Sequence, residues 1–347
     1  MKLKKIKINN NNISINHNPY IIVEACVNHQ GEISIAKKMI RAAKKAGAHC
    51  IKFQHHIVDE EMLRNNIPKS KNFDSSLEEV IESTNFTLKQ HSDLKKLCDK
   101  LNIDYLCTPF SIKAADELES IGLKAFKTGS GELTNHPFIQ HLAKKGKPMI
   151  VSTGMSQKYE IKETVRILKK YSTPFALMHC VSAYPCPYEI MNLDFINELI
   201  RDYQVPVGLS CHTPTIYNSL GAVSLGSSLI EKHFTFDKTL PGPDHKSSID
   251  EKELRILVDG CHANFLARGN RRIIHKEEKE IVAWAREAVV STKDIQKGEK
   301  LTKNNIATKR PTPKNNEIPA NLFFKQINKT AKKLIKQNKK IKFSDIE

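Results

Sequence analysis

The chain has no apolar run long enough to cross a membrane and only one tryptophan. A membrane span needs roughly 18 to 20 consecutive apolar residues, so the sequence predicts no membrane association. The first residues, MKLKKIKINNNNISIN, also lack the apolar segment of a secretory signal. We therefore expect a cytoplasmic protein.

The eight cysteines include no Cys-x-x-Cys pair and are scattered among apolar neighbours. This pattern does not suggest a disulfide framework. The spacing therefore favours reduced, free thiols, as is usual for an intracellular protein.

Arginine is scarce as well: the net charge of +17 comes from 45 Lys and only 10 Arg. Residues 286–347 hold 16 basic and 6 acidic side chains, so +10 of the charge lies in this tail. Aromatic residues make up only 7% of the chain. Lysine faces that lack arginine and aromatic residues are typical of solvated surface, and we expect no nucleic-acid partner.

A length of 347 residues favours one large domain with a smaller companion. Between residues 19 and 266, short apolar runs alternate with amphipathic helical patterns. Repeated strand–helix alternation predicts a parallel sheet closed into a (β/α)₈ TIM barrel. The eight predicted strands are Tyr20–Glu24, Cys50–Phe53, Ile103–Cys107, Ala125–Lys127, Met149–Val151, Phe175–Cys180, Val205–Leu209 and Ser228–Lys232.

The main alternative fold is an open, doubly wound sheet. That fold predicts a glycine-rich turn after the first strand, where this chain has Glu-Ala-Cys-Val-Asn-His instead. The expected organisation is an N-terminal extension (1–18), the barrel (19–266), a charged linker (267–285) and a small β-rich domain (286–347). About 30 residues separate the second strand from the helix near Thr87, and a connection of that length is usually functional or mobile.

Every predicted strand delivers a polar side chain to its carboxyl end, and in a closed barrel these ends converge on one mouth. Lys52 and Lys127 place two positive charges there, beside the hydroxyls of Thr108, Ser130 and Ser152. Lysine serves as a point charge for phosphate, so this set favours a small ligand that carries phosphate and carboxylate.

His212 and His233 follow neighbouring strands and could share one divalent metal. With two protein ligands, the remaining coordination positions of the metal ion would be filled by water or by substrate oxygens, as in an open catalytic site. The alternative is a pair of ordinary strand-end histidines.

Short motifs follow the predicted strands in order: Ile22–Gly31, Ile51–Gln54, Cys107–Ser111, Lys127–Glu132, Val151–Met155, Gly208–Thr213, Glu231–Thr235 and Gly242–Asp244. These motifs resemble the bacterial sialic acid synthases, and the resemblance spans nearly the whole chain. Lys309–Pro311 is similar to the signature of that family's C-terminal antifreeze-like (SAF) domain.

The resemblance implies that phosphoenolpyruvate condenses with an N-acylated aldose, N-acetylmannosamine, to give N-acetylneuraminate and phosphate. It implies Glu24 as the general acid–base residue. It also implies a divalent metal on His212 and His233, typically Mn²⁺, with Mg²⁺ or Co²⁺ as alternatives. The resemblance assigns phosphoenolpyruvate to Lys52, Thr108, Lys127, Ser130, Ser152, Ser182 and Ser210.

For the sugar, the resemblance implies Tyr184 and Asp244, with Arg310 supplied by the partner chain of a domain-swapped homodimer. The chain departs from the family pattern at two positions, where Cys211 and Ser182 replace the usual Asp and Asn. Cys211 either supplies a soft metal ligand or removes a polar group beside the metal.

Two other functions stay open. One is N,N'-diacetyllegionaminate synthesis from 2,4-diacetamido-2,4,6-trideoxymannopyranose: Phe53 and Asp237–Thr239 lean towards this type, whereas His55–Met62 leans towards the neuraminate type. The other is a non-catalytic sugar- or ice-binding protein. A pure binder has no need of two lysines, two histidines and a glutamate around one barrel mouth, so an enzyme is favoured.

Overall fold

The computed structural model describes residues 4–64, 76–269 and 272–347. The chain divides into two compact units, Met1–Gly269 and Asn270–Glu347. The first unit ends three residues beyond the predicted end of the barrel at residue 266.

Within the described residues, eight strands form one sheet in the order β5-β4-β3-β10-β9-β8-β7-β6. The outer strands of this order, β5 and β6, contact each other, so the sheet closes into the predicted (β/α)₈ barrel. Each predicted strand is present, with bounds that differ by at most two residues. The strands are β3 (Tyr20–Glu24), β4 (Cys50–His55), β5 (Asp104–Pro109), β6 (Phe126–Thr128), β7 (Met149–Ser152), β8 (Phe175–Cys180), β9 (Val207–Cys211) and β10 (Leu229–His233).

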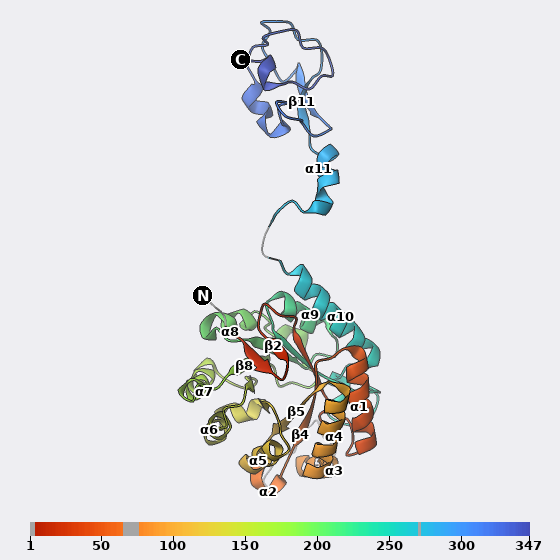
Figure 1. Ribbon diagram of the computed structural model, residues 1–347, viewed down its shortest axis with the longest axis vertical. Helices are drawn as coiled ribbons and strands as arrows, with labels where there is room; N and C mark the ends of the chain where they lie inside the picture. The colour runs from red at the N-terminus through yellow and green to blue at the C-terminus, as the bar shows by residue number, and fades with distance from the viewer. Residues whose placement is uncertain (1–3, 65–75, 270–271) are drawn as a thin grey trace. The chain divides into compact units, whose positions relative to one another are not determined.

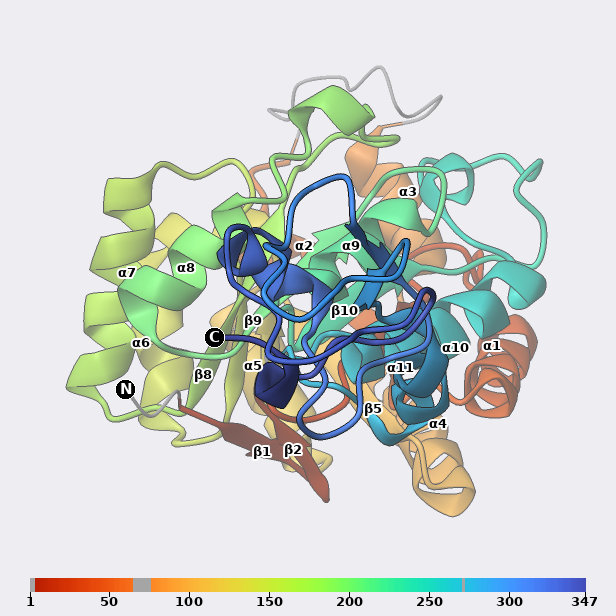
Figure 2. The same cartoon turned by 90° about the horizontal axis from the view of Figure 1, so that it is seen from above.

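The helices lie outside the strands, with α6, α7 and α8 on one side and α1, α4 and α10 on the other (Figure 1 and Figure 2). Their ends follow local sequence signals: Thr87 and Asp250 begin α4 and α10 with capping boxes, and Gly47 ends α1 at a φ of 85°. The helices of the first unit are α1 (Ile33–Ala46), α2 (Val58–Glu61), α3 (Leu77–Thr84), α4 (Leu88–Leu101), α5 (Ile112–Ser120), α6 (His136–Lys144), α7 (Lys158–Lys170), α8 (Phe195–Tyr203), α9 (Tyr217–Ser224) and α10 (Glu251–Ala267).

The long connection after β4 contains α2 and α3, and its residues 65–75 lie outside the described part of the chain. The predicted N-terminal extension forms an antiparallel hairpin of β1 (Ile6–Ile8) and β2 (Asn11–Ile13). Its isoleucines pack with Tyr20, Ile22 and other residues from the amino-terminal halves of the barrel strands. Burying such side chains contributes about 1.5–3 kcal/mol each, so the hairpin closes and stabilises the barrel interior at that end.

The α-helix of the second unit that the structure describes is α11 (Lys279–Ala285), which lies inside the predicted linker. Strands β11 (Ala288–Ser291) and β12 (Ile306–Lys309) then pair antiparallel, and turns and short 3₁₀ segments fill most of the remainder. Its small core consists mainly of isoleucines. This unit has the predicted β-rich character.

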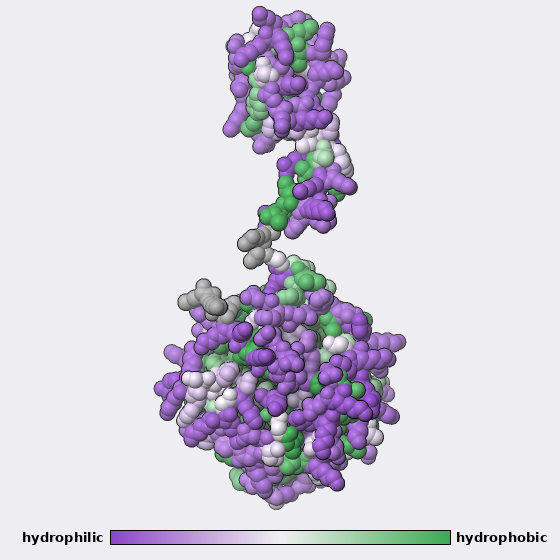
Figure 3. All heavy atoms as spheres, in the orientation of Figure 1, coloured by the Kyte–Doolittle hydropathy of each residue, from purple (hydrophilic) through white to green (hydrophobic). Residues whose placement is uncertain are grey.

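The surface in Figure 3 is mostly hydrophilic, in keeping with the lysine-rich composition. None of the helices that the structure describes combines the length and apolar character that a membrane span requires.

Candidate active site

Strand register aligns three residues of the site on neighbouring strands of the barrel. Glu24 on β3 pairs with Lys52 on β4 and with His233 on β10. Successive side chains of a strand point to opposite faces, so Glu231 and His233 project into the mouth while Lys232 points away. The ammonium of Lys232 instead donates to backbone carbonyls of the β9 strand end and the loop after it.

These strand ends line a cavity of about 590 Å³. It gathers all the site residues that were predicted within the barrel: Glu24, Lys52, Thr108, Lys127, Ser130, Ser152, Ser182, Tyr184, Ser210, His212, His233 and Asp244. Arg310 lies in the second unit, where its Nε donates to the carbonyl of Ala285 at 3.1 Å and its guanidinium stands over the ring of Trp284.

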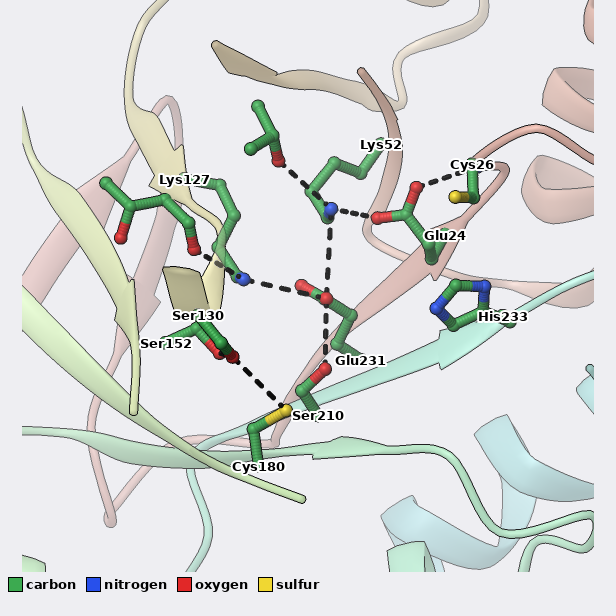
Figure 4. Close-up of polar contacts among 12 residues, drawn as sticks. Glu24, Cys26, Lys52, Lys127, Ser130, Ser152, Cys180, Ser210, Glu231 and His233 are labelled. Atoms are coloured by element: carbon green, nitrogen blue, oxygen red, sulfur yellow. Dashed lines mark hydrogen bonds and ion pairs between the residues drawn. The ribbon is translucent and has the colours of Figure 1, made fainter. Parts of the chain in front are cut away.

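The two lysines are paired with two carboxylates, whereas the sequence predicted two positive charges and hydroxyls at the mouth but not how the charges pair. Lys52 forms an ion pair with Glu24, and its Nζ lies 3.8 Å from Oε1 of Glu231 (Figure 4). Nζ of Lys127 lies 3.7 Å from the same Oε1, which also accepts a hydrogen bond of 3.1 Å from Ser210. Unpaired buried ammonium groups would cost several kcal/mol each, which explains why carboxylates accompany them.

Glu231 is a central residue that was not predicted as a site residue. The signal that could have found it is the strand alternation, which places residue 231 on the same face as His233. Burial raises the pKa of Glu231, but the ammonium groups of Lys127 and Lys52 lower it more, so it lies below its ordinary value. Burial lowers the pKa of Lys52 to about 8, against the opposing effect of Glu231. Both groups are therefore charged at pH 7.

Hydroxyl groups surround the lysines, as predicted. Thr108 accepts a hydrogen bond of 3.1 Å from Nζ of Lys52, and the hydroxyls of Ser130 and Ser152 lie 2.9 Å apart. The Cys180 thiol, which was not predicted, lies 3.5 Å from the Ser130 hydroxyl. Donors of this kind can surround the oxygens of a small anion.

The two predicted histidines lie together, with ring centroids 5.3 Å apart, and the Tyr184 ring is 4.1 Å from that of His212. Nδ1 of His212 donates to the Val181 carbonyl at 2.8 Å. The lone pair of Nε2 is therefore available to bind a proton or a metal ion. Burial lowers the pKa of His233 well below its ordinary value, so this imidazole is neutral and has a lone pair available for a metal.

The donors in the mouth fit a divalent ion. Cys26, His233 and Asp244 each offer a ligand atom, and these atoms lie within 4.8 Å of one another. Asp244, predicted as a sugar contact, therefore faces His233, with Oδ2 3.8 Å from Nδ1. Cys211 does not join this set: its buried thiol lies 3.2 Å from the Thr213 hydroxyl, in the layer between strands and helices. The suggestion that Cys211 supplies a soft ligand is wrong, because strand alternation turns its side chain away from the mouth.

One wall of the cavity is apolar, and the sequence did not identify it. Met62, Leu77, Val80 and Ile81 line this wall, and all four come from the long connection after β4. The prediction of function for that connection rested only on its unusual length.

A parallel barrel whose strand ends gather paired lysines, glutamates, histidines and hydroxyls is the architecture of a (β/α)₈-barrel enzyme. Residues 39–272 match the NeuB family, and residues 286–347 match the SAF domain. The chain belongs to the NeuB family, and it is a synthase of the sialic acid synthase type with a C-terminal SAF domain. The alternative of a non-catalytic sugar- or ice-binding protein therefore falls away.

Named relatives differ in their product. The chain is 37% identical to the N,N'-diacetyllegionaminic acid synthase of Campylobacter jejuni, over 93% of this chain and 98% of the relative. It is 32% identical to the pseudaminic acid synthase of Helicobacter pylori, over 95% and 98%. The crystal structure of the N-acetylneuraminic acid (sialic acid) synthetase of Leptospira borgpetersenii, in complex with citrate, is 33% identical and superposes with a TM-score of 0.74 over 81% of this chain and 95% of the other.

Proposed function

We propose that this enzyme condenses phosphoenolpyruvate with an N-acylated aldose to give a nine-carbon 2-keto sugar acid and phosphate. The observation that carries the proposal is the pair of buried ammonium groups, Lys52 and Lys127, which share the carboxylate of Glu231 and lie with several hydroxyls in one cavity. Phosphoenolpyruvate carries up to three negative charges on a small frame, and it matches this arrangement of point charges and donors.

In this reaction, C3 of phosphoenolpyruvate forms a bond to the aldehyde carbon of the open-chain sugar. Water then adds at C2, and the tetrahedral intermediate breaks its C–O bond to release phosphate. Glu24 is the general acid–base group: its Oε1 accepts the Cys26 N–H at 2.7 Å, and the carboxylate faces Lys52, so the proton carrier is held in place.

A divalent ion, Mn²⁺ in the expectation from the family, would be held by His212 and His233 and would polarise the aldehyde as a Lewis acid. The orientation of the imidazoles supports this role. Nδ1 of His212 is engaged by a backbone carbonyl, and His233 is neutral.

Two sugars fit the proposal. N-acetylmannosamine, which would give N-acetylneuraminate, keeps hydroxyls at C4 and C6. The sugar 2,4-diacetamido-2,4,6-trideoxymannopyranose, which would give N,N'-diacetyllegionaminate, has a second acetamido methyl and a C6 methyl in their place. The apolar wall of Met62, Leu77, Val80 and Ile81 favours the second sugar, because methyl groups gain from contact with apolar surface. The 37% identity to a legionaminic acid synthase points the same way.

The test is phosphate release from phosphoenolpyruvate with each sugar separately, in the presence of a divalent ion. We expect release that depends on the sugar, with a higher kcat/KM for the trideoxy sugar. Replacing Leu77 by Asn should lower kcat/KM for the trideoxy sugar more than for N-acetylmannosamine. Equal release with and without sugar would contradict the proposed condensation, whereas preference for N-acetylmannosamine would contradict only the choice of sugar.

We also propose that the enzyme is a homodimer in which Arg310 of one chain contacts the N-acyl group bound in the other. The Arg310 side chain is exposed, and a guanidinium stays charged and can donate hydrogen bonds to the carbonyl oxygen of an N-acyl group.

A further inference from the structure

Cys26 has an unusual backbone conformation for its residue type. Its φ is 41°, in the left-handed region, which costs a residue other than glycine roughly 1–2 kcal/mol. The Cys26 N–H donates to Oε1 of Glu24 at 2.7 Å, and this bond holds the turn. Strain of this kind is often retained where a side chain has a function. Here the conformation brings the thiol into the mouth of the barrel.

The thiol meets two further potential ligands. Ligand atoms of Cys26, His233 and Asp244 lie within 4.8 Å of one another, and all three residues are buried. Among the described residues, Nδ1 of His233 has no hydrogen-bond partner, although only 5% of this residue is exposed. A buried polar atom without a partner is costly, and a cation placed among these three groups would satisfy it.

We infer that Cys26 is a thiolate ligand of the divalent ion, together with His233 and Asp244. The thiolate and the carboxylate balance the two positive charges of the ion. His212, whose ring centroid lies 5.3 Å from that of His233, stands beside this set as a further nitrogen donor. The site thus combines sulfur, nitrogen and oxygen.

A thiolate in the donor set enlarges the difference in affinity between metals. Thiolate and imidazole suit Zn²⁺ and Co²⁺, whereas Mn²⁺ and Mg²⁺ prefer carboxylate, carbonyl and water. Cys26 should therefore increase the margin by which the site binds Zn²⁺ and Co²⁺ more tightly than Mn²⁺. The inference rests on the proposed function only for the catalytic role of the metal ion. Metal binding itself can be measured without either substrate.

The experiment uses the full-length protein, stripped of metal and kept reduced, and titrates it with Co²⁺ while the absorption spectrum is recorded. A sulfur-to-cobalt charge-transfer band should appear in the near ultraviolet at one equivalent. Cys26→Ser should lose the band and bind Zn²⁺ at least about tenfold more weakly, with a smaller change for Mn²⁺. Cys26→Gly, which tolerates the positive φ, should lose the band as well, so a folding defect cannot explain both results.

The matched control is Cys261→Ala, which removes another buried thiol on α10 and should keep the band. A cobalt complex of the unaltered protein without the band would overturn the inference, as would a band that survives in Cys26→Ser. Failure to bind Co²⁺ or Zn²⁺ at all would overturn it too. Phosphate release is assayed separately with Mn²⁺ supplied in excess. The metal-binding results therefore neither support nor contradict the proposed condensation.

Discussion

Replacing Glu231 by Gln tests whether one carboxylate stabilises both lysines of the cavity. The variant keeps the shape of the side chain and an oxygen that can accept from Ser210, but it removes the charge. Oε1 lies 3.8 Å from Nζ of Lys52 and 3.7 Å from Nζ of Lys127. At an effective dielectric constant near 20, each attraction is worth about 4 kcal/mol before desolvation. Removing one partner of a buried ion pair typically costs about 3–5 kcal/mol, and we expect a loss of that size in the free energy of unfolding.

The measurement is urea unfolding followed by far-ultraviolet circular dichroism, because most helices belong to the barrel. The fluorescence of Trp284, the one tryptophan, reports on the second unit separately. The control Ser210→Ala removes only a hydrogen bond, worth about 1 kcal/mol. Phosphoenolpyruvate should raise the unfolding midpoint of Glu231→Gln more than that of the unaltered enzyme, since it supplies the missing negative charge. A loss no larger than that of the control, with no added benefit from phosphoenolpyruvate, would refute the reasoning.

Three further results are expected. Glu24→Gln should lower kcat by about 10² to 10⁴, because the proton carrier is lost while its shape is kept. The value of kcat/KM for phosphoenolpyruvate should fall as the pH rises through about 8, because Lys52 then loses its proton and its positive charge. Arg310→Ala should raise the KM for the N-acyl sugar more than that for phosphoenolpyruvate, and mixing it with Glu24→Gln should restore some activity through mixed dimers.

Each of these has a clear contrary outcome. Near-normal turnover of Glu24→Gln would remove Glu24 from the reaction. A pH profile that stays flat from 7 to 10 would show that the charge of Lys52 is not needed. Sedimentation of the enzyme as a monomer, or inactive mixtures in which mixed dimers are demonstrated, would contradict the shared site.

The sequence predicted the barrel and most of its mouth for a physical reason. Strands of a parallel barrel are apolar runs of limited length, and their carboxyl ends must converge, so residues such as Lys52, Lys127 and His212 could be assigned to one place before any distance was known. The family motifs added roles to these positions.

The sequence did not show how charges pair across strands. The contact of Glu231 with both lysines depends on the register of β4, β6 and β10 around the closed barrel, and no local pattern encodes that register. The position of Cys26 was missed for a related reason, since its thiol reaches His233 only through a left-handed turn. Three residues of the apolar wall, Leu77, Val80 and Ile81, come from α3, and Met62 follows α2. Their spacing is that of a helix face, but it does not show which side of the barrel mouth that face covers.

The most direct test of the central claim follows the atoms of phosphoenolpyruvate. The enzyme is incubated with a divalent ion, one N-acyl aldose and phosphoenolpyruvate that carries a heavy-oxygen label in the bridge between C2 and phosphorus. Mass spectrometry then examines both products. The account predicts a nine-carbon 2-keto sugar acid that contains all three carbons of phosphoenolpyruvate and no label, together with phosphate that carries the label. Pyruvate in place of the sugar acid, or label that stays on carbon, would contradict it.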